Sequence, residues 1–206
     1  MRQSDPAAQR ALDQMVKAHQ ALVTFSCRVQ VDAVSEKRRE TTTATLAYQK
    51  PNRIRLEVQS PGKPLVLSVC DGTTRLSAGT RRGKAEGGEK ALTSALIEAN
   101  LLITPAFLYL VSRSAPVDTL LPGSVKLLAL GTPLMLDDVP VIVVVADVAT
   151  RAGSAHLRFA MGKEDHLLRK LSVETAFAKE NLSLMELYSA VKANPSLDKT
   201  LFMLPK

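Results

Sequence analysis

The chain has 206 residues, of which 46% are hydrophobic, and a formal net charge of +7 at pH 7. This length and apolar content suit a single domain over residues 1–206 with a core of its own. The surplus of Lys and Arg favours anionic surfaces such as phospholipid or nucleic acid, and it also serves solubility. The most apolar stretch, residues 95–111, is interrupted by Glu98, Asn100 and Pro105, so it is too short for the roughly 20 apolar residues of a membrane-spanning helix.

The first third of the chain predicts one helix followed by antiparallel strands. Asp5 and Pro6 supply a capping residue and a first-turn proline, and apolar residues follow at helical spacing over residues 6–22. From Val23 the pattern changes to alternating apolar and polar residues, which is typical of a strand with one solvated face. Asp71-Gly72 then marks a tight hairpin turn. The five expected strands cover residues 23–31, 42–48, 53–58, 65–70 and 74–79.

The rest of the chain predicts two helices and a second group of strands. Residues 89–103 and 105–113 read as helices separated by Pro105, with a broad apolar face that includes Ala99. The strands that follow are separated by short turns without intervening helices, which indicates another antiparallel arrangement. These later strands cover residues 125–131, 139–149, 154–161, 167–177 and 182–191.

Together these elements predict an α+β domain built on one large curved antiparallel sheet, with an N-terminal helix and a helical lid. Nearly every strand has a polar row, so we expect the apolar rows to share a single concave side. The row formed by Ile54, Leu56 and Val58 illustrates the pattern, because Arg53 and Arg55 alternate with it. Residues 88–113 are the segment long and apolar enough to cover that side.

Neither the N-terminus nor the cysteines determine the cellular compartment of the protein. The first ten residues, MRQSDPAAQR, have no apolar core, so the protein is either cytosolic or the mature form of an exported protein with a start Met added. Cys27 and Cys70 are too few for a disulfide framework. Three inter-strand steps of about 4.8 Å separate their expected strands by roughly 14 Å, so we expect two free thiols.

Signals for catalysis or metal binding are weak. His19, His156 and His166 lack metal-ligand spacing, and no elbow motif surrounds Cys70. The adjacent acidic pairs at 137–138 and 164–165 fall in expected turns, where carboxylates are common. We therefore expect no enzyme, no metal and no cofactor.

Basic clusters raise the possibility of nucleic-acid binding. They occur at residues 37–39, at Arg53 with Arg55, and at 81–84, which we assign to a basic loop. Proteins that bind single strands combine such charges with stacking aromatics, whereas this chain has no Trp, three Tyr and five Phe. We expect basic hairpin tips on a solvated sheet and no nucleic-acid partner.

The order of elements resembles a known family. An N-terminal helix leads into VTFSCRVQV, and YQKPNRIRLEV, LVLSVCDGTTRL and HLRFAMGKEDHLLRKLSVE follow, before the tail VKANPSLDKTLFMLP. The more specific pieces are Lys50-Pro51, the Ser-x-x-Asp-Gly hairpin that ends at Gly72, and the Asn-Pro-Ser tail with Phe202 and Pro205. This set resembles the periplasmic lipoprotein carriers and outer-membrane lipoprotein-sorting proteins (LolA/LolB-like).

The resemblance implies an unclosed β-barrel whose apolar cavity takes the acyl chain of a lipid or lipoprotein in the periplasm or cell envelope. We also expect a monomer, with an anionic membrane surface or envelope proteins as further partners. Lys50 takes the place of an arginine that closes the lid in the carriers. The expected cavity and lid residues are Phe25, Val29, Leu46, Tyr48, Ile54, Leu56, Val58, Leu92, Leu96, Leu102, Ile103, Phe107, Leu157 and Phe159.

This chain departs from the carriers at Lys50, in its few aromatic residues and in its basic segment 81–90. A second interpretation is therefore a protein-interaction or stress-sensing module of the same fold, similar to envelope-stress regulators, whose cavity is filled by its own lid. A continuous apolar void beneath residues 88–113 would favour lipid binding, whereas close packing there would favour the interaction module.

Overall fold

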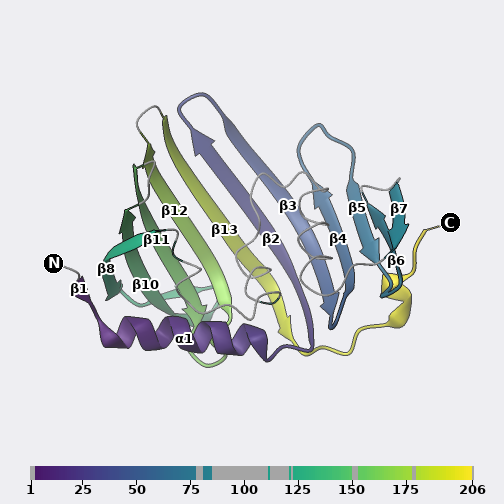
Figure 1. Ribbon diagram of the computed structural model, residues 1–206, viewed down its shortest axis with the longest axis horizontal. Coiled ribbons are helices and arrows are strands. Elements are labelled where there is room, and N and C mark those ends of the chain that lie inside the picture. Colours follow the sequence, from purple (N-terminus) through teal and green to yellow (C-terminus); the bar gives the residue numbers. More distant parts are fainter. Residues whose placement is uncertain are drawn as a thin grey trace. The chain divides into compact units, whose positions relative to one another are not determined.

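The computed structural model describes residues 3–77, 81–84, 111, 121, 123–149, 153–177 and 180–205. None of the helices in this part of the chain has the length and hydropathy needed to cross a membrane. The elements are β1 (Gln3–Ser4), α1 (Pro6–Gln20), β2 (Thr24–Ser35), β3 (Arg39–Gln49), β4 (Arg53–Gln59), β5 (Val66–Cys70), β6 (Thr74–Ser77), β7 (Arg81–Lys84), β8 (Ser124–Leu130), β9 (Leu134–Leu136), β10 (Val139–Ala149), β11 (Gly153–Gly162), β12 (Leu168–Phe177), β13 (Glu180–Ala193) and the 3-10 helix η2 (Lys199–Phe202) (Figure 1).

Hydrogen bonding orders the described strands as β1-β8-β10-β11-β12-β13-β2-β3-β4-β5-β6-β7, with β9 attached to β10. The predicted α+β class with a large antiparallel sheet is confirmed. The short pair β1–β8 is parallel and was not predicted. The chain divides into two compact units, residues 1–21, 31–40 and 114–187 (unit 1) and residues 22–30, 41–113 and 188–206 (unit 2).

In unit 1, helix α1 begins as its sequence predicts. The Asp5 carboxylate accepts a hydrogen bond from the backbone N–H of Ala7 at 2.8 Å, and Pro6 occupies the first helical position. The helix buries Leu12 and Met15, which are both fully shielded, and it packs against β8 and β10. The predicted helix is therefore confirmed, although it ends at Gln20.

Strand β10 of unit 1 corrects the expectation that the apolar rows share a single side. Val144 is buried on one face, while Val141 and Val143 form a separate cluster with Ala160 on the other face. The uninterrupted apolar run of residues 139–146 is the pattern of a strand buried on both faces. Strand β9 was not predicted, and its Leu136 packs on this second cluster.

In unit 2, the strands β3 to β7 form an antiparallel ladder. Leu46 lies opposite Leu56, and Tyr48 lies opposite Ile54, so the alternating apolar row of the sequence forms one continuous face. Residues 81–84 form β7, paired with β6, so their assignment to a basic loop was wrong. Arginines have long apolar stems that a strand accommodates, and charge alone did not distinguish loop from strand.

The predicted hairpin at Asp71-Gly72 joins β5 and β6. The Asp71 carboxylate accepts hydrogen bonds from the backbone N–H groups of Thr73 and Thr74 at 2.7 and 2.8 Å. These bonds, led by that from Thr74, hold the pKa of Asp71 below its usual range. Gly72 has a φ of 105°, which explains the glycine.

Candidate ligand-binding site

The predicted cavity residues that the structure describes are all buried. Their exposed fractions run from 1% for Phe25 to 4% for Leu157. The lid residues Leu92, Leu96, Leu102, Ile103 and Phe107 lie outside the described residues, so the lid stays a prediction. Unit 2 contains Phe25, Val29, Leu46, Tyr48, Ile54, Leu56 and Val58, and unit 1 contains Leu157 and Phe159.

The buried row of unit 2 is an uncharged environment. Burial raises the pKa of Tyr48 to about 12, and its hydroxyl donates to the Pro51 carbonyl at 3.4 Å. Burial also raises the pKa of the Cys27 and Cys70 thiols. Both thiols are free and lie on β2 and β5. Such a surface accepts methylene groups and excludes ionised ligand atoms.

Ser68 is the polar exception in this row. It lies on β5 directly opposite Leu56 and is 1% exposed. Its hydroxyl makes no hydrogen bond within the part of the chain that the structure describes. A buried hydroxyl without a partner is unfavourable, so this atom is placed where a ligand oxygen could pair with it. Sequence reasoning missed Ser68, although SVC interrupts an otherwise apolar strand.

Lys50 occupies the corner between β3 and β4. Its backbone N–H donates to the carbonyl of Val23 at 2.8 Å, and the Lys50-Pro51 peptide bond is cis. The lid that Lys50 was predicted to close lies outside the described residues. Its role as a clasp therefore stays a prediction.

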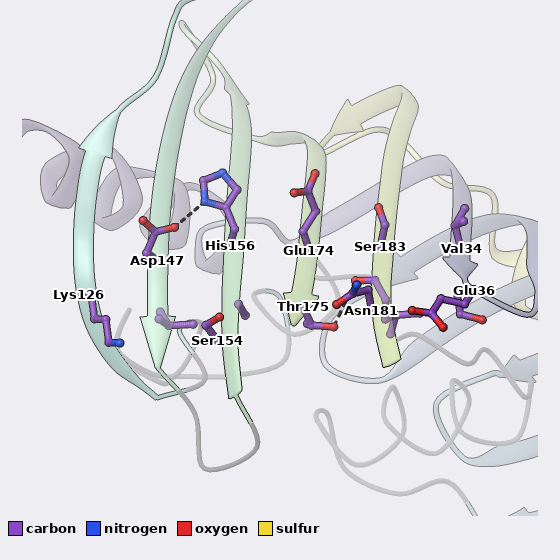
Figure 2. Close-up of a pocket in the computed structure, with 14 residues that line it drawn as sticks. Val34, Glu36, Lys126, Asp147, Ser154, His156, Glu174, Thr175, Asn181 and Ser183 are labelled. Atoms are coloured by element: carbon purple, nitrogen blue, oxygen red, sulfur yellow. Dashed lines mark hydrogen bonds and ion pairs between the residues drawn. The ribbon is translucent and has the colours of Figure 1, made fainter. Parts of the chain in front are cut away.

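Unit 1 contains a cavity of about 660 Å³ at one end of β10 to β13. The strand register places Asp147, His156, Glu174 and Ser183 side by side in one row, as Figure 2 shows. His156 Nδ1 lies 2.5 Å from an Asp147 carboxylate oxygen, and both side chains are more than one-third exposed. Sequence reasoning did not select this row, because register alone brings its members together.

The chemistry of this row is limited. No group of three or more His, Cys, Asp or Glu side chains within the described ranges could hold a metal ion. His156 and Asp147 are satisfied by each other, and Ser183 lies beyond Glu174 rather than next to the imidazole. The arrangement thus lacks a serine within reach of a histidine base.

His19 is a structural residue of unit 1. It is fully buried, and its Nδ1 lies 2.8 Å from the Met15 carbonyl, while the Leu168 N–H lies 3.4 Å from Nε2. Burial lowers the pKa of His19 to about 4, so the imidazole is neutral near pH 7. Neutral imidazole can donate at Nδ1 and accept at Nε2, which connects α1 to the start of β12.

Solved structures share this fold at low sequence identity. MucB matches 97% of this chain with 11% identity and a TM-score of 0.55, and the chain spans 63% of the length of MucB. LprF from Mycobacterium bovis matches 95% of this chain and 98% of its own length, with 14% identity and a TM-score of 0.51. The lipoprotein LppX from Mycobacterium tuberculosis matches 95% and 100%, with 13% identity and a TM-score of 0.50.

No protein-family model matches the chain, and no curated protein matches it. The fold that the order of elements predicted is confirmed by these three structures.

Proposed function

We propose that the protein binds a lipid or the acyl chain of a lipoprotein in the bacterial cell envelope and releases it without covalent chemistry. The observation that carries this proposal is the continuous, uncharged row of unit 2 formed by Leu46, Ile54 and Leu56, together with the Ser68 hydroxyl in it, which has no hydrogen-bond partner in the described residues. Transfer of an acyl chain from water to such a surface contributes about 0.8 kcal/mol per methylene group.

Ser68 adds a polar contact to this proposal. An acyl ester or carboxyl carries an oxygen that accepts a hydrogen bond, and the Ser68 hydroxyl is a donor inside the apolar row. We expect Ser68→Ala to weaken binding of an acyl ester and to leave binding of an alkane probe unchanged. An equal effect on both probes would show that Ser68 acts through packing alone.

The experiment that tests the function is mass spectrometry of lipids extracted from the purified protein, followed by titration of the delipidated protein with a fluorescent fatty acid. Leu96→Asp and Leu102→Asp, in the predicted lid, should reduce probe binding while circular dichroism stays unchanged. Absence of extracted lipid, together with wild-type probe binding in both folded variants, would overturn the proposal.

Lys50 offers a kinetic test of lid closure. Arginine presents a planar fork of donors, whereas lysine presents a single hydrated charge. We expect Lys50→Arg to slow release of the probe in stopped-flow measurements and Lys50→Ala to leave binding nearly unchanged. Release at the wild-type rate from Lys50→Arg would remove Lys50 from the mechanism.

The second candidate is a protein-interaction module whose cavity is filled by its own lid. The near-complete burial of the described row favours it, because a filled interior also excludes water. A module of this kind would carry no lipid through purification and would leave the fatty-acid probe unbound in the wild-type protein. The same titration therefore separates the two functions.

A further inference from the structure

A second cavity lies within unit 2, on the polar side of its strands. It has a volume of about 530 Å³ and is lined from β2, β3, β4 and β13 and by Leu197 and Leu201 of the C-terminal segment. Thr45 and Ala47 line it from β3, where they alternate with Leu46 of the buried row and lie opposite Glu57 and Arg55. The polar side of the strands thus faces the cavity, and Cys27 and Leu46 of the buried row also border it.

The C-terminal segment is attached at both ends of this cavity. At one end, Asn194 accepts a hydrogen bond from the Val23 N–H at 2.7 Å, and the Thr24 hydroxyl donates to the Pro195 carbonyl at 2.7 Å. At the other end, Phe202 is 1% exposed, and the Arg55 guanidinium donates to the Leu201 carbonyl at 3.3 Å. The segment forms a fixed wall, and the small side chains Ser26, Thr45, Ala47 and Ala190 leave space against it.

The charges around the cavity are not balanced. Arg55 is paired with Glu57 at 2.6 Å. Arg28 and Lys192 also line the cavity, are exposed, and have no ion-pair partner within the described ranges of the chain. The lining therefore carries two uncompensated positive charges next to apolar wall residues.

The backbone at this place is unusual. Ala190, near the C-terminal end of β13, has a φ of 49°, a conformation that residues with a Cβ adopt at an energetic cost. Strain of this kind is concentrated at binding sites. Here it interrupts the alternation of β13 at the position where the strand lines the cavity.

We propose that this cavity binds the anionic head group of an amphiphile, with a phosphate or carboxylate between Arg28 and Lys192 and the first part of the chain against Leu197 and Leu201. An oxyanion complements this site, because Arg28 and Lys192 are donors without an acceptor in the described part of the chain. The leucines and alanines require an apolar portion next to the anion. The site is independent of the acyl-binding row proposed above.

The test is titration of the full chain with monomeric lysophosphatidylglycerol, below its micelle concentration, followed by isothermal calorimetry. We expect Arg28→Gln/Lys192→Gln to weaken binding by at least about tenfold. The matched control Arg10→Gln/Lys17→Gln removes the same charge from exposed positions of α1 and should leave binding unchanged. Thermal unfolding verifies that both variants stay folded.

Titrations with two further ligands identify which chemical groups the cavity recognises. Inorganic phosphate and a lysophosphatidylcholine of the same chain length should each bind at least about tenfold more weakly than lysophosphatidylglycerol. The proposal is overturned if phosphate alone binds as tightly, if the zwitterionic lipid binds as tightly, or if the control variant loses as much affinity as the cavity variant. Loss of fatty-acid binding in the buried row would leave these results unaffected, so the two sites can fail separately.

Discussion

The cavities of units 1 and 2 differ in the sign of their unpaired charges. In unit 1, His156 and Asp147 bind each other, but Glu36, Glu174 and Lys126 also line the cavity without an ion-pair partner in the described residues, so its unpaired charges have both signs. In unit 2, Arg55 and Glu57 are paired, but Arg28 and Lys192 add positive charge without a counterion in the described residues. Two solvated rows with the same alternating pattern thus differ in the sign of the charges left unpaired, and the unit 2 cavity is the one whose unpaired charges in the described residues are all positive.

The largest expected effects concern the buried rows that both units contain. Phe159→Ala in unit 1 and Leu56→Ala in unit 2 should each lower the free energy of unfolding by about 2 to 5 kcal/mol, because each removes a side chain that is at most 2% exposed. Urea unfolding followed by circular dichroism measures both.

The same experiment checks the single domain predicted over residues 1–206. One domain should show a single unfolding transition that both variants shift. The control is Thr45→Ala, on the exposed side of β3, which should change the free energy of unfolding by no more than about 0.5 kcal/mol. Two transitions, each sensitive to one variant, would mean that the units unfold separately.

The next largest effect is expected in unit 1, where the buried His19 makes stability depend on pH. Because the pKa of His19 falls from 6.5 to about 4 on folding, the unfolded chain binds a proton in this range that the native protein does not. The contribution of His19 to the free energy of unfolding should therefore be fully present above pH 6.5. It should decrease as the pH falls toward 4, by roughly 3 kcal/mol in total. Below pH 4 this contribution should stay constant.

Urea midpoints measured between pH 7 and pH 4 check this decrease. His19→Asn removes the titrating group and should flatten the profile, whereas His156→Asn, at a partly exposed position, serves as the control. An unchanged slope in His19→Asn would assign the acid sensitivity to other groups.

A smaller effect on stability is expected in unit 2, from the strained backbone at Ala190. Ala190→Gly should raise the free energy of unfolding by about 1 kcal/mol, because glycine adopts the φ of 49° without a Cβ clash. Ser189→Gly, one position earlier in β13, should instead lower it by roughly 0.5 to 1 kcal/mol. Thermal unfolding compares the two, and destabilisation by Ala190→Gly would show that no strain is stored there.

The smallest effect concerns the ion pair of the unit 1 cavity. His156 and Asp147 are 38% and 43% exposed, so solvent screens their attraction. Asp147→Asn should lower the free energy of unfolding by less than about 1 kcal/mol. A double-mutant cycle with His156→Asn measures the coupling between the two side chains, and a coupling above about 2 kcal/mol would contradict the solvent-screened pairing expected here.

Local patterns in the sequence determined most of the elements. The Asp5-Pro6 start of α1, the strict alternation of 53–58 and the Asp71-Gly72 hairpin each follow from short-range physics: a cap, a two-residue period and a turn that needs a positive φ. The burial of Leu46, Ile54 and Leu56 also followed from the sequence, because an alternating apolar row must be covered.

The tertiary structure decided which residues meet. Strand register placed Asp147 beside His156 and Ser68 opposite Leu56. Each pair joins two different strands, so the alternation within one strand does not predict it. The sequence placed Arg28 on the solvated side of a strand and Lys192 in the C-terminal tail. The tail became a cavity wall through contacts with residues more than one hundred positions away. Periodicity specifies the face of each side chain, whereas strand pairing and tail attachment specify its neighbours, and binding depends on the neighbours.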